Sequence, residues 1–148
     1  MTAETRARET LDWLDFAQAD LTAATDCLAD PHHYRAFHAC FWSQQAAEKA
    51  IKAALIYANV PVNRWHDLVR LAEMLPDGWT ARTLSDGLDT LSGYAVDSRY
   101  PGALLDPTHD DALQALEDAN TVMRTVTGDL LDHGLTIPTH VPLDPGGS

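Results

Sequence analysis

No glycine occurs in this sequence before Gly78, and the first 61 residues contain only two prolines, Pro31 and Pro61. Glycine and proline are the residues that most disfavour the interior of a helix. The residue before a proline also avoids the helical conformation. The first part of the chain is therefore divided into two long segments, 1–30 and 31–60, with no strong helix breaker inside either.

Apolar residues recur through the first segment at alternating intervals of three and four, which is the period of an amphipathic helix. This pattern predicts a helix over residues 5–29, which ends before Pro31. The expected buried stripe comprises Leu11, Leu14, Gln18, Leu21, Thr25 and Leu28 with Ala17 and Ala24, and a second row of Trp13, Phe16, Ala23 and Cys27 widens it.

The second segment predicts a helix that begins at Pro31 or His33 and ends at Asn59. It is rich in alanine, which allows a neighbouring helix to approach closely, and in other good helix formers. The expected stripe on this helix comprises Phe37, Phe41, Gln44, Ala47, Ile51, Leu55 and Ala58.

Helical patterns continue through the second half of the chain. The expected segments are residues 66–75, 80–94 and 107–133. Thr108 and Asp111 resemble a capping box at the start of the last segment, and Gly134 suits its end. Its expected stripe comprises Leu113, Leu116, Ala119, Asn120, Met123, Val126 and Leu130.

No segment alternates as a strand would, so the sequence predicts an all-α fold. The long helices and short connections indicate an up-and-down bundle of about five helices. The chain has 148 residues, a length that suits one domain with its own core. We expect the bundle to occupy residues 1–134. The tail, residues 135–148, contains three prolines and two glycines and is expected to be non-helical.

Composition excludes several classes of function. The net charge is −12, and so acidic a chain would repel the phosphates of nucleic acid unless it carried a local basic cluster; binding to DNA is not expected. No apolar run reaches the roughly 20 residues of a membrane span, and the first ten residues have no signal-peptide core. We expect a cytoplasmic protein. The two cysteines form no metal-ligand array, and no metal or other cofactor is predicted.

Gln44 is unusual because it falls on the apolar stripe of the second helix. Glu48 and Lys52 follow at intervals of four, so all three side chains share one helix face. Two interpretations stay open. Gln44 could bond a loop backbone and fix helix packing, or the three residues could line a polar cleft that binds a ligand. The Glu48–Lys52 spacing also suits an ordinary ion pair within a helix.

Three motifs in this order resemble the HEPN family, the higher eukaryotes and prokaryotes nucleotide-binding domain. They are the run from Gln44 to Ala53 (QQAAEKAIKA), His66-Asp67-Leu68, and Arg99-Tyr100-Pro101. The opening helix with Trp13 and Ala19-Asp20-Leu21 also fits, and the resemblance covers roughly residues 8–133. The first motif is fairly specific, and the two short ones carry weight only together with it.

The resemblance implies a bundle of about five helices that forms a homodimer. Such domains are often encoded beside a small nucleotidyltransferase, as in a toxin–antitoxin pair. Many members cut RNA without a metal: a dimer joins two Arg-x(4–6)-His motifs, in which histidine moves protons and arginine stabilises negative charge. Other members are non-catalytic and bind nucleotides or RNA.

The catalytic motif is absent from this sequence as written. Nine residues separate Arg99 from His109, and eight separate Arg124 from His133. The His-x-Tyr signature, at which a partner enzyme modifies such toxins, is absent too. We therefore expect a binding module rather than an enzyme. The alternatives are a divergent ribonuclease that uses Arg99 and His109, and a purely structural adaptor.

The expected ligand-binding residues are Gln44, Glu48, Lys52, His66, Arg99 and Tyr100. Arg99 could pair with a phosphate while Tyr100 stacks on a base. Alternatively, Arg99 pairs with Asp97 or Glu48 and Tyr100 closes the end of the bundle. His66 could join Arg64 and Arg99 around a ligand, or it could merely cap or pack against the third helix.

Overall fold

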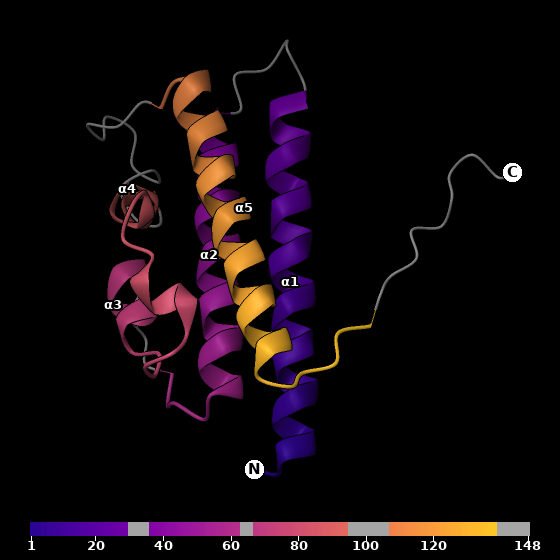
Figure 1. The fold of residues 1–148 in the computed structure, drawn as a ribbon. Coiled ribbons are helices and arrows are strands. Elements are labelled where there is room, and N and C mark those ends of the chain that lie inside the picture. Colours follow the sequence, from indigo (N-terminus) through magenta and orange to yellow (C-terminus); the bar gives the residue numbers. More distant parts are fainter. Residues whose placement is uncertain (30–35, 63–66, 95–106, 139–148) are drawn as a thin grey trace, which may run out of the picture.

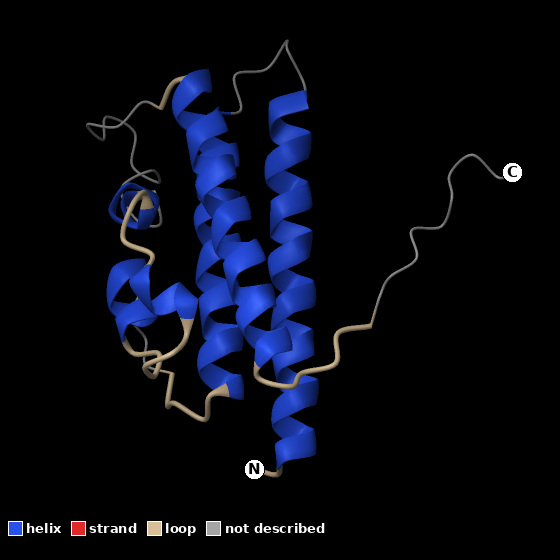
Figure 2. Ribbon diagram, viewed as in Figure 1, coloured by secondary structure: helices blue, strands red, loops and turns tan. Residues whose placement is uncertain are grey.

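The computed structural model describes residues 1–29, 36–62, 67–94 and 107–138. Three long helices lie side by side: α1 (Ala3–Ala29), α2 (Ala36–Tyr57) and α5 (His109–Asp132). Three short elements, α3 (Leu68–Glu73), the 3₁₀ turn η1 (Thr80–Thr83) and α4 (Leu88–Gly93), pack on the side of α2 and α5 away from α1 (Figure 1). The described residues contain helices and loops but no strand (Figure 2). The predicted all-α bundle is confirmed.

Helix α2 lies at the centre and is buried on nearly every side. It packs against α1, α5, α3 and α4. Its interior alanines are all fully or almost fully buried: Ala39, Ala46, Ala47, Ala50, Ala53 and Ala54. Ala46 packs with Leu21 of α1 and Ala119 of α5 in a small cluster where the three long helices meet. Alanine has no side chain beyond Cβ, so the surrounding helices can approach α2 closely.

The ends of the long helices have local causes. At the start of α5, the Thr108 hydroxyl accepts from the Asp111 amide, and the Asp111 carboxylate accepts from the Thr108 amide. The predicted capping box is therefore confirmed. After α5, Gly134 has φ +95° and the Leu135 amide bonds back to the Leu130 carbonyl. This arrangement is a Schellman motif, so the predicted glycine end is also confirmed.

Helix α2 ends in the same way, with an asparagine in place of glycine. Asn59 has φ +60°, and the Val60 amide donates to the Leu55 carbonyl over 2.9 Å. Asparagine is one of the few residues other than glycine that tolerates this conformation. The helix ends at Tyr57 and Asn59 lies in its C-terminal cap, so the predicted end is close to the observed one. The predicted start at Pro31 or His33 lies outside the described residues.

The prediction of one helix over residues 80–94 is wrong. The chain forms η1, breaks, and resumes as α4 after Gly87, which has φ +82°. A Cβ at Gly87 would lie 2.6 Å from the Asp118 side chain, so both the backbone and the close approach to α5 favour glycine here. The third helix is also shorter than predicted, because Asp67 caps α3 from outside it.

Several predicted core positions are exposed. Gln18 and Thr25 face solvent, and the side chain of Phe16 is 60% exposed. On α5, Leu113 is 46% exposed, while the buried row begins at Ala112 and continues through Ala115, Ala119, Val122 and Val126. At the start of α5 the predicted buried row, which begins at Leu113, is therefore shifted by one residue from the row that is buried, which begins at Ala112. Helix α1 contacts chiefly α2, so it buries a narrower face than its apolar residues suggest.

The first residues of the predicted tail pack against the bundle. Leu135 is buried and Ile137 is half-buried against the core. Residues 139–148 lie outside the described residues. No helix in the described ranges is long and apolar enough to cross a membrane.

Candidate functional site

A row of buried polar side chains runs along the face of α2. Gln44 is completely buried and Glu48 nearly so. The Gln44 amide donates to Glu48 Oε1 over 3.4 Å and accepts from Gln45 Nε2 over 2.6 Å. The predicted partner of Gln44, a loop backbone, is thus replaced by two side chains of its own helix. Its amide is satisfied without a ligand, although an unpaired buried amide would cost about 1–3 kcal/mol.

Lys52 completes this row one turn further along α2. Its ammonium pairs with Glu48 Oε2 over 3.2 Å, and both side chains are almost buried. The same ammonium lies 5.9 Å from the centre of the Trp13 ring on α1. The structure therefore brings together Gln44, Glu48 and Lys52 as predicted, and it adds a cation–aromatic contact that ties the row to the neighbouring helix.

A second ion pair crosses between α1 and α2. The Lys49 ammonium lies 2.5 Å from Asp20 Oδ2, and the Asp20 side chain is mostly buried. Neither residue is among the expected ligand-binding residues. The sequence does carry a signal for this ion pair. The only two lysines of the chain, Lys49 and Lys52, lie three residues apart in the second predicted helix, and the first predicted helix is rich in Asp and Glu. Both lysines are anchored against α1.

This polar seam, defined as Asp20, Gln44, Glu48, Lys49 and Lys52, is built mainly from internal pairs. Each of its carboxylates accepts from a lysine, so the charges are compensated where they are removed from water. The Asp20–Lys49 pair joins α1 to α2 and opposes a shift of one helix along the other, because such a shift would leave the buried Asp20 carboxylate unpaired. A ligand could reach Lys49 or Lys52 from the solvent side, but not the Gln44 amide.

The other predicted site residues are separated from this seam or lie outside the described ranges. His66, Arg99 and Tyr100 belong to the second group. His109 is exposed and is the first residue of α5. Asp110 and Asp111 follow it directly, so its immediate neighbours are anionic.

A buried thiol–phenol pair lies between α2 and the end of α4. Cys40 and Tyr94 are linked by a side-chain hydrogen bond. Burial raises the pKa of the Cys40 thiol from 9.0 to about 11, a shift that the bond to Tyr94 opposes and the Asp111 charge reinforces. Burial also raises the pKa of the Tyr94 phenol to about 12, with smaller contributions from Cys40 and Asp111. Both groups are therefore neutral near pH 8.

We predict that the protein loses stability as the pH rises from about 9 to 11. The unfolded thiol ionises near its ordinary pKa of 9.0 while the native thiol stays protonated to about 11, so the unfolded state releases a proton first and is favoured. Urea unfolding of wild type and Cys40→Ala across this range measures the effect. Wild type should lose more stability than the variant, and parallel losses would contradict the assignment.

Comparison with known proteins gives two matches. The family model described as the HEPN domain matches residues 10–129. The solved crystal structure of the protein TT1696 from Thermus thermophilus shares 30% sequence identity with this chain. The match covers 84% of this chain and 98% of that one, and the two superpose with a TM-score of 0.68. A search of curated proteins found no match.

Proposed function

Because this chain belongs to the HEPN domain family, we propose that it is a homodimeric binding module that partners a small nucleotidyltransferase in a toxin–antitoxin-like pair. In this proposal the module binds nucleotide or RNA. The observation that carries it is the family match over residues 10–129 in a chain that lacks the Arg-x(4–6)-His motif. The family relates the chain to nucleotides or RNA in general, and the missing motif favours binding over cleavage.

Two features of the surface support a role in association. Large apolar side chains are exposed on the long helices: Phe16 is 60%, Leu113 46% and Leu131 53% exposed. Each is solvated in the single chain, and association with another protein would remove it from water. The net charge of −12 further favours a partner with a basic face.

Affinity purification of the tagged protein from its native cell tests this proposal, with mass spectrometry and absorbance spectra of the eluate. We expect a small nucleotidyltransferase to co-elute and the module to run as a dimer by light scattering. A clean protein without nucleotidyltransferase or nucleotide would overturn the proposal. The structural-adaptor alternative predicts that Gln44→Leu changes only stability and retains every partner.

The ribonuclease alternative has a separate test. Cleavage of RNA that disappears in both Arg99→Ala and His109→Ala would support it and would replace the binding role. Cleavage that persists equally in both variants would end it, because this alternative assigns charge stabilisation to Arg99 and proton transfer to His109.

A further inference from the structure

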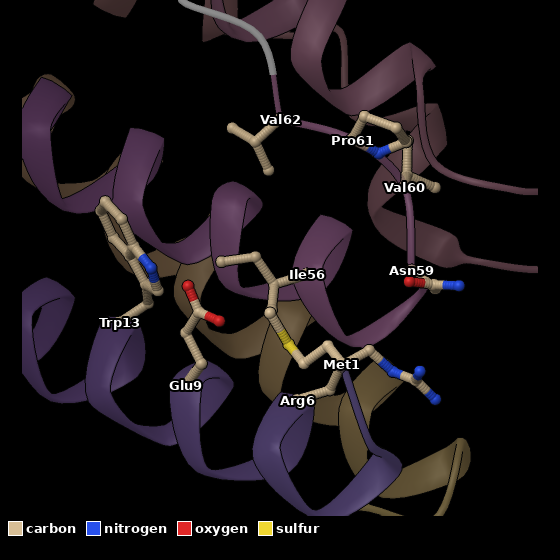
Figure 3. A pocket seen from close by; sticks show the side chains of 9 residues that line it. All are labelled: Met1, Arg6, Glu9, Trp13, Ile56, Asn59, Val60, Pro61 and Val62. Carbon is tan, nitrogen blue, oxygen red and sulfur yellow. The ribbon is translucent and has the colours of Figure 1, made fainter.

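A cavity of about 360 Å³ opens where the first half of α1 faces the end of α2. Its walls are mainly apolar and come from Met1, Trp13 of α1, Ile56 of α2, and Val60, Pro61 and Val62 directly after α2 (Figure 3). This volume lies within the range of small-molecule sites, which are largely apolar with a few polar groups that orient the ligand. None of the polar-seam side chains lines it.

The polar groups of this cavity have no partners within the described part of the chain. Arg6 and Glu9 are half-buried and lie one helical turn apart on α1. In Figure 3 the Glu9 carboxylate points into the cavity between Trp13 and Ile56, and the Arg6 guanidinium lies on the side of Asn59. Neither charge makes a hydrogen bond or ion pair among the described residues, and neither does the Trp13 indole N–H. These groups are therefore available to a ligand.

The arrangement of these groups defines what the cavity can hold. Apolar walls with an indole at one side suit a flat aromatic ring. A carboxylate beside that indole accepts a hydrogen bond from an amino group on the ring. A guanidinium one turn away suits a phosphate, which it can bind through two parallel hydrogen bonds. The opposite charges of Glu9 and Arg6 thus suit a ligand with a donor at one end and an anion at the other.

We propose that this cavity binds an amino-substituted purine nucleotide. The ring lies between Trp13 and the Ile56–Val62 wall, its exocyclic amine donates to Glu9, and its phosphate pairs with Arg6. The proposal rests on the proposed function for the ligand class only. It assigns that ligand to a site at the start of α1 rather than to the polar seam or to the residues of the predicted motifs.

Calorimetric titration of the full chain with adenosine monophosphate, adenosine and inorganic phosphate tests the site. We expect the nucleotide to bind about tenfold more tightly than adenosine, because only the nucleotide can pair with Arg6. Phosphate alone should show no measurable binding. Arg6→Gln should weaken nucleotide binding about tenfold and leave adenosine unchanged, whereas Glu9→Gln should weaken both.

Two matched variants control for the charge changes. Arg8→Gln and Glu4→Gln alter the same charges on α1, but both positions are exposed and neither lines the cavity. They should change affinity less than about twofold, since only long-range electrostatics is altered. Equal losses in Arg6→Gln and Arg8→Gln, or no nucleotide binding at millimolar concentration, would overturn the site. Co-elution of a nucleotidyltransferase with Arg6→Gln and Glu9→Gln tests the proposed function separately.

Discussion

Replacing Asp129 by alanine is expected to lower the free energy of unfolding by about 3 kcal/mol. The Asp129 carboxylate is only 3% exposed and accepts hydrogen bonds from the Thr80 amide over 3.0 Å and the Ala81 amide over 2.8 Å. These amides are at the start of η1, and Ala81 is completely buried. Alanine at this position would leave the Thr80 and Ala81 amides without an acceptor, and the buried Ala81 amide would have little access to water.

Urea denaturation at pH 7 measures this effect, and the chain provides a matched control. Asp132 lies three residues further along α5 and is exposed, so Asp132→Ala removes the same charge without a buried contact. It should change stability by less than about 0.5 kcal/mol. Asp129→Asn should fall between the two, because its amide oxygen can still accept one of the bonds. Equal stability of Asp129→Ala and Asp132→Ala would show that this cap contributes little.

Replacing Ala17 by leucine is expected to cost about 2–3 kcal/mol of stability. Ala17 is completely buried and belongs to the main core, on the helix that makes its most extensive contact with α2. The additional carbon atoms have no room unless α1 moves away from α2. Such a movement would also strain the ion pair between Asp20 and Lys49, which spans the same interface.

Ala19→Leu is the control for this second prediction. Ala19 lies two residues away on α1 and is exposed, and leucine has nearly the helix propensity of alanine. Its effect on the midpoint of thermal unfolding should be close to zero, whereas Ala17→Leu should lower that midpoint clearly. An unchanged midpoint in both variants would mean that the α1–α2 interface has enough space for a leucine side chain in place of Ala17.

The candidate sites differ in how far sequence analysis could find them. The seam residues Gln44, Glu48 and Lys52 follow from helical spacing, because residues four apart on one helix are neighbours in any fold. Asp20 was not selected as their neighbour, since its ion pair joins residues 29 apart in the sequence. The cavity beside Trp13 was not predicted either, because its two sides come from the start of α1 and the end of α2.

The sequence by itself determined the helices and most of their ends. The early absence of glycine favours a helical backbone locally, and the Thr108–Asp111 box and the Gly134 end act through hydrogen bonds between residues within a few positions of one another. Tertiary structure decided how much of each predicted apolar face is buried. Phe16 is exposed while Asp129 is buried, because burial depends on which elements pack nearby. The close approach of Gly87 to Asp118 likewise exists only once α5 is in place.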